Sequence, residues 1–173
     1  TYRYVVNTVF WASGNIWSMV AIYGPGCPAS ATYNVHYRMD FDIEGASGDY
    51  FWKHDGPWTQ PALEHNYPDD GSYDPGGAEW VNFQGSTGRA FYTRPWPTDD
   101  AWMYALKFVA GQGDTDLAPL TFPDAFDNNE AIQNTDNVNW YWTHIPYTRP
   151  AGCPPTCDPT SVFGLPIMVP GGF

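Results

Sequence analysis

Residues 33–44 read YNVHYRMDFDIE, and this stretch alternates between apolar and polar side chains more regularly than any other part of the chain. Its odd-numbered positions are aromatic or aliphatic, and its even-numbered positions are polar or charged. Because a β-strand sends successive side chains to opposite faces, the pattern predicts a strand with one face in a core and one polar face. We expect it to be a central strand of a β-sandwich. Asp40 and Asp42 would then lie side by side on the polar face, and two adjacent carboxylates favour a cation.

The composition of the whole chain favours the same fold class. Its 173 residues suggest one domain with a substantial core. Aromatic residues make up 18% of the chain, and glycine and proline number 17 each, a combination typical of all-β proteins with long ordered loops. We therefore predict an all-β, antiparallel β-sandwich with long ordered loops and a Pro-rich C-terminal tail.

The charge of the chain limits its partners. Seven basic residues against nineteen acidic residues give a net charge of −12, which disfavours nucleic-acid binding through phosphate neutralisation. No apolar run approaches the roughly 20 residues of a membrane span. No signal peptide is visible, and the abrupt start at Thr1 is typical of a mature or trimmed form.

The three cysteines leave three disulfide pairings open. Cys153 and Cys157 could close a small loop, or Cys27 could pair with one of them and attach the tail to the sheet. A structural zinc site usually has four ligands, so three cysteines do not favour one. An acidic, Trp-rich chain with a candidate disulfide predicts an extracellular or cell-surface location.

Hydrophobic runs and turn residues predict the order of the elements. Residues 46–78 are expected to be irregular because they hold four prolines and several glycines, and one helical turn is expected near residues 124–126. We assign residues 1–144 to the sandwich and residues 145–173 to an extended Pro-rich tail packed on its surface. Strands are expected at residues 2–12, 16–23, 33–44, 79–84, 89–94, 101–109 and 137–144.

Four segments carry a resemblance to a known family. They are TYRYV at residues 1–5, RMDFDIEG at 38–45, IQNTDNVNWY at 132–141 and LPIMVP at 165–170. Their order along the chain and the Arg-x-Asp-x-Asp spacing resemble the later part of the catalytic domain of the copper amine oxidases. These are quinone-dependent enzymes with a large β-sandwich.

The resemblance implies that the copper and quinone chemistry of the family is altered in this chain. The family binds copper through two histidines of the key strand and one nearer the end. The strand positions correspond to Ala31 and Tyr33, and only His144 resembles a ligand. Tyr2 stands at the position of the quinone tyrosine, between residues that differ from the family motif. Because Cu(II) prefers several nitrogen ligands, we expect no copper, and we expect His144 to be a histidine at the edge of the core.

The resemblance also implies a calcium site. Family members often bind calcium through two aspartates of the key strand, a third aspartate before a later strand, and two backbone carbonyls. Calcium takes six to eight oxygen ligands, so water would complete such a set. The alternative interpretation is a solvated acidic face that Arg38 partly neutralises. The residues at the family's ligand positions are Asp40, Asp42, Asp136 and, through their carbonyls, Phe41 and Asn137.

Three functions follow from these observations. The first is a non-catalytic secreted structural or interaction module, stabilised by calcium. Self-association into an oligomer or filament is expected because the parent sandwich has earlier strands that this chain lacks, which leaves open sheet edges. The second is a divergent copper- and quinone-dependent amine oxidase with ligands recruited from His36, His54 or His65. The third is a carbohydrate-binding module that uses loop aromatics such as Trp52 and Trp58.

Overall fold

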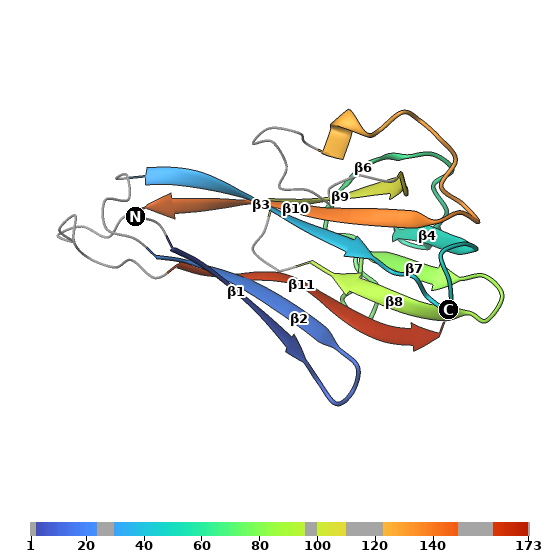
Figure 1. Cartoon of the computed structure of the whole chain (residues 1–173), viewed down its shortest axis with the longest axis horizontal. Coiled ribbons are helices and arrows are strands. Elements are labelled where there is room, and N and C mark those ends of the chain that lie inside the picture. Colours follow the sequence, from blue (N-terminus) through green and yellow to red (C-terminus); the bar gives the residue numbers. More distant parts are fainter. Residues whose placement is uncertain (1–2, 24–29, 96–99, 110–122, 149–160, 173) are drawn as a thin grey trace.

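The computed structural model describes residues 3–23, 30–95, 100–109, 123–148 and 161–172. These residues form an all-β molecule of two antiparallel sheets that pack face to face as a β-sandwich (Figure 1). The predicted fold class is confirmed. Within the described ranges, none of the helical structure is long and apolar enough to cross a membrane.

The larger sheet has seven strands, and all its neighbouring strands are antiparallel. In spatial order the strands are β1 (Arg3–Phe10), β2 (Ile16–Tyr23), β11 (Ser161–Gly172), β8 (Arg89–Arg94), β7 (Trp80–Gln84), β4 (Asp49–His54) and β5 (Trp58–Thr59).

The smaller sheet has four antiparallel strands. In spatial order they are β3 (Ser30–Asp40), β10 (Asn137–Thr148), β9 (Asp100–Lys107) and β6 (His65–Pro68). A short 3-10 helix, η1 (Pro123–Ala125), lies at the expected helical turn.

The core lies between the two sheets. Phe51 and Trp80 from the larger sheet meet Met39, Met103 and Tyr141 from the smaller one, and all five are at most 4% exposed. The rings of Trp80 and Tyr141 meet edge to face across the interface, with centroids 6.2 Å apart. Burial of such large aromatic side chains is the main driving force that holds the sheets together.

The stretch at residues 33–44 forms a strand, but not over its whole length and not at the centre of a sheet. β3 ends at Asp40, and the chain then turns through Glu44 (φ 64°) and Gly45 (φ 137°). Among the described residues β3 pairs with β10 alone, so it is an edge strand and the prediction of a central strand is wrong. Alternation of apolar and polar residues indicates only that one face of a strand is buried, and this holds for an edge strand as well as for a central one.

The segment at residues 46–78 is not irregular throughout, because it contains β4, β5 and β6. β4 pairs with β7 over five residues and buries Phe51 completely. The tertiary pairing overrides the local density of glycine and proline, which had predicted a loop.

The C-terminal residues form a strand inside the sheet, not a tail on the surface. β11 lies between β2 and β8, and Pro166 and Met168 are buried. Its prolines interrupt little of the pairing with β2. Pro166 lies in an irregularity of the register with β2, and Pro170 lies beyond the last residue paired with β2. The expectation of a surface tail is therefore wrong for residues 161–172.

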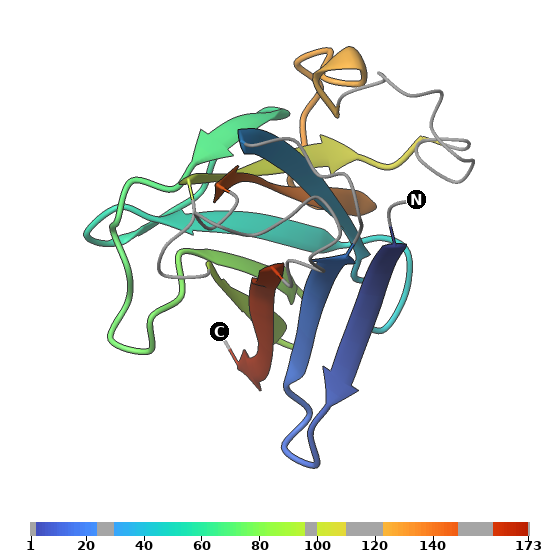
Figure 2. The same cartoon turned by 90° about the vertical axis from the view of Figure 1, so that its left-hand side faces the viewer.

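The two sheets differ in width, and this leaves one strand uncovered. β3 lies over β2, where Val20 packs against Tyr33, Val35 and Tyr37. β1 is the next strand outward, and Figure 2 shows its hairpin with β2 projecting beyond the rest of the molecule. Val6 is paired with Val20 and shares its face, yet Val6 is 61% exposed.

Candidate metal centre

The structure brings together the three aspartates that the sequence analysis singled out. Asp40 ends β3, Asp42 follows two residues later, and Asp136 immediately precedes β10. β3 and β10 pair with Asp40 opposite Val138, and this antiparallel register brings Asp136 level with Asp42. One carboxylate oxygen from each aspartate can be chosen so that all three lie within 4.8 Å of one another.

The local charges make this cluster attractive to a cation. The guanidinium of Arg38 donates to Asp40 at 3.0 Å and supplies one positive charge against three negative ones. Partial burial, together with the charges of Asp40 and Asp42, raises the pKa of Asp136. A hard divalent cation would replace this repulsion by attraction.

A fourth carboxylate, that of Asp49, lies near the three. Asp49 opens β4, and its main chain forms an isolated antiparallel bridge with Thr135, the neighbour of Asp136. Burial, and then the charges of Asp136, Asp42 and Asp40, raise the pKa of Asp49 to about 7. The sequence analysis missed this residue because it lies in the segment that was expected to be irregular.

Phe41 and Asn137, whose carbonyls the resemblance adds to the ligand set, are chain neighbours of these aspartates. The carbonyl of Phe41 accepts a hydrogen bond from the Ile43 amide at 2.5 Å, which closes a tight turn around Asp42. Asn137 is buried, and its side-chain oxygen accepts a hydrogen bond from the Thr135 hydroxyl at 2.9 Å. These bonds order both loops that carry the aspartates. The donor set is made of oxygen atoms only, which suits calcium and does not suit copper.

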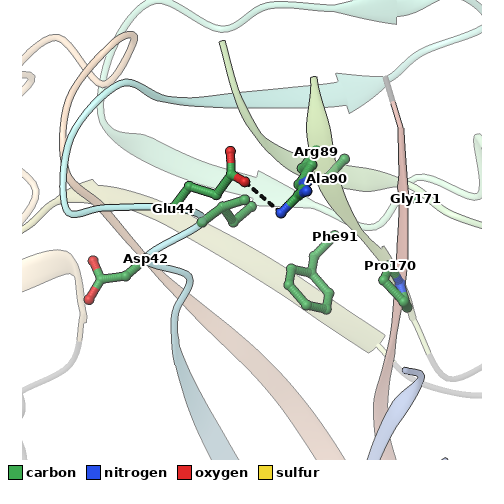
Figure 3. A pocket seen from close by; sticks show the side chains of 8 residues that line it. Asp42, Glu44, Arg89, Ala90, Phe91, Pro170 and Gly171 are labelled. Carbon is green, nitrogen blue, oxygen red and sulfur yellow. Dashed lines mark ion pairs between the residues drawn. The ribbon is translucent and has the colours of Figure 1, made fainter. Parts of the chain in front are cut away.

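An open pocket adjoins the acidic cluster. Its volume is about 500 Å³, and its walls are mostly apolar, with Ile43, Phe91 and Pro170 among the lining residues. Glu44 and Arg89 form an ion pair at 2.5 Å beside it, and Figure 3 shows the carboxylate of Asp42 pointing away from that pair. The pocket therefore adds an apolar surface beside the acidic cluster and no further ligand to it.

The family's copper and quinone positions do not gather a second site among the described residues. Tyr2 lies outside them, as do Cys27, Cys153 and Cys157, and Ala31 is described only in its main chain. Tyr33 packs against Val20 in the core. His144 packs edge to face on Trp102 and Trp142, with centroid distances of 4.8 and 5.0 Å.

Of the other three histidines, one shares the contact with Trp142 and two lie elsewhere. His36 packs on Trp142, His54 lies 3.1 Å from the carbonyl oxygen of Ser72, and the exposed His65 lies 3.5 Å from Asp127. Across the part of the chain that the structure describes, the three aspartates are the one group of three or more histidine, cysteine or acidic residues with ligand atoms this close.

A second group of buried charges lies beside β4 and β7. The ammonium of Lys53 donates to Asp70 and lies 3.3 Å from the carboxylate of Glu79. Glu79 is fully buried and also accepts the Asp70 amide at 3.1 Å. Burial, and then the hydrogen bond and charge of Asp69, raise the pKa of Glu79 to about 8. Lys53 supplies the positive charge that pairs with the carboxylates of this group.

No family model matches the chain, and no curated protein matches it.

Proposed function

We propose that this chain is a non-catalytic, extracellular structural or interaction module that self-associates through its open sheet edges and binds calcium at Asp40, Asp42 and Asp136. The uncovered face of β1 is the observation that carries this proposal. Val6 and Phe10 belong to the face that is core elsewhere in the sheet, yet they are 61% and 74% exposed.

The position of the uncovered face indicates what would cover it. β3 is the edge strand that lies over β2, and within the described residues its outer edge has no neighbouring strand. A strand added beside β3 would satisfy that edge and lie over β1. A strand from a second copy fits this position, and a contact that does not close on itself would propagate into a filament.

The distribution of charge favours a second copy as the occupant. The chain carries a net charge of −12, so two copies repel each other over most of their surfaces. Residues 4–37 contain no aspartate, glutamate, lysine or arginine. They form β1 except for its first residue, Arg3, all of β2 and most of β3, so the neutral part of the chain coincides with these open edges.

Sedimentation velocity over a wide concentration range tests the proposal. We expect the wild-type chain to form dimers or larger assemblies, and we expect Val6→Lys to shift it to monomers, because it places charge on the uncovered face. Leu63→Lys is the matched control, since Leu63 is also an exposed aliphatic residue, at 47%. A wild-type chain that stays monomeric at every concentration would refute self-association.

Elemental analysis with a quinone stain separates this proposal from a divergent amine oxidase. We expect calcium at about one ion per chain and a negative stain. Stoichiometric copper with a positive stain would replace the proposed function by an oxidase.

A row of aromatic side chains supports carbohydrate binding as a second candidate function. Tyr50 and Phe83 stack with centroids 5.2 Å apart, Trp52 adjoins Phe83 at 6.1 Å, and Trp58 meets Tyr92 at 5.9 Å. All five are partly exposed, and flat aromatic surfaces stack on sugar rings. A glycan array tests this candidate: binding lost in Trp52→Ala or Trp58→Ala would support it, and no binding by the wild type would exclude it.

A further inference from the structure

Asp49 connects the acidic cluster to the opposite sheet. The three clustered aspartates lie at the ends of β3 and β10 in the four-stranded sheet, whereas Asp49 belongs to β4 in the seven-stranded sheet. The Asp49 amide donates to the Thr135 carbonyl at 3.1 Å, and the Thr135 amide donates to the Asp49 carbonyl at 3.3 Å. The side-chain amide of Asn137 donates to the same Asp49 carbonyl at 3.3 Å. Asp49 is thus attached to the residues on both sides of Asp136.

The carboxylate of Asp49 lacks the partners that a buried acid normally has. The residue is 2% exposed, and within the described residues neither carboxylate oxygen has a hydrogen-bond partner. An unpaired carboxylate in a protein interior is strongly unfavourable. A buried lysine or arginine would offset that cost, yet the charged groups that act on Asp49 are the three other aspartates. A cation at the cluster would offset it instead.

We infer that Asp49 is a fourth carboxylate of the cation site, and that the bound ion joins the two sheets at this end of the sandwich. This inference rests on the proposed calcium site. The set of ligand atoms within 4.8 Å of one another does not include Asp49, so Asp49 reaches the ion through a water ligand. Calcium sites commonly include water, and hydrogen bonds from outer groups orient such ligands. Asp49 is therefore a positioning residue for the site.

The inference predicts opposite effects of one substitution in the absence and presence of calcium. In Asp49→Asn the buried charge is removed, so the melting temperature of the calcium-free variant should rise. The same change should weaken calcium binding tenfold or more and reduce the thermal shift that calcium produces. Asp55→Asn is the control, because Asp55 is an exposed aspartate just after β4, and both its calcium affinity and its melting temperature should match the wild type.

Isothermal titration with calcium chloride and thermal unfolding with and without EDTA measure these effects. Wild-type chain that binds no calcium would overturn both the proposed site and this inference. Wild-type binding that Asp40→Asn abolishes and Asp49→Asn leaves unchanged would overturn the inference alone.

Amide hydrogen exchange in the wild-type chain gives a test that needs no variant. The amides of Asp49 and Thr135 join the two sheets, so calcium should slow their exchange tenfold or more. Unchanged exchange of both amides in a calcium-saturated chain would overturn the inference.

Discussion

Replacing Glu64 by alanine should destabilise the fold more than the loss of any exposed acid. Glu64 immediately precedes β6 and is 1% exposed. Its carboxylate accepts three backbone amides: Lys107 at 2.7 Å, Asn128 at 3.0 Å and Glu130 at 3.3 Å. One side chain therefore fixes the end of β9 and the segment that leads towards the acidic cluster.

The size of the effect follows from those three bonds. A hydrogen bond to a charged group contributes about 1.5–3 kcal/mol. The two shorter bonds to Glu64 then account for roughly 3–6 kcal/mol, and the third bond is long. Because amides near the surface can bind water once the acceptor is gone, we expect a loss of about 3–4 kcal/mol. For a chain of this size that loss lowers the melting temperature by about 10 °C.

Urea denaturation followed by tryptophan fluorescence measures the loss. Glu130→Ala is the control, because it removes a neighbouring carboxylate whose ion pair with Lys107, at 3.4 Å, is solvent-exposed. Such pairs contribute at most about 1 kcal/mol. A loss below about 1 kcal/mol for Glu64→Ala, with an unchanged denaturant slope, would refute the account of Glu64 as the anchor of this region.

Three further outcomes are expected. Glu79 has a pKa of about 8 in the folded chain against an ordinary value of 4.5. As the pH rises, the carboxyl group therefore loses its proton in the unfolded chain before it does so in the folded chain. The free energy of unfolding should fall between these two pH values. Urea midpoints at pH 5 and pH 8 should show a smaller fall in Glu79→Gln than in the wild type; equal falls would contradict the assignment. Gly14→Ala should cost about 1–2 kcal/mol in thermal unfolding, because Gly14 has φ 87° and an added Cβ would lie 2.8 Å from Pro170; an unchanged melting temperature would argue against this packing. Calcium at about 100 times its dissociation constant should add about 2.7 kcal/mol to the stability, and EDTA should reverse that gain; a calcium-saturated chain with no gain would contradict a structural role for the ion.

The fold class and the acidic cluster could be predicted because each leaves a local pattern. The alternation at residues 33–40 predicts a strand with one buried face, and Asp40 and Asp42 continue the series of even-numbered polar positions. Asp136 could be added only through the resemblance, since nothing in its own neighbourhood indicates that β10 pairs with β3.

The remaining features depend on contacts between distant residues. The strand status of Asp49–His54 comes from pairing with β7, and the burial of Asp49 comes from its bridge to Thr135. The prolines of β11 are tolerated because of an irregularity in its register with β2 and because that pairing stops at Ile16, the first residue of β2, and no local pattern reveals either feature. The uncovered face of β1 results from the unequal widths of the two sheets. The sequence of β1 itself looks like that of any half-buried strand.

The place of β11 in the larger sheet has a consequence for synthesis of the chain. Among the described residues, β11 is the strand that joins the β1–β2 hairpin to β8, and it pairs Met168 with Ile16. The hairpin therefore leaves the ribosome long before the strand that docks it has been translated. Folding that waits for contacts so far apart in sequence is slow, and the neutral hairpin is exposed to other nascent chains during that wait.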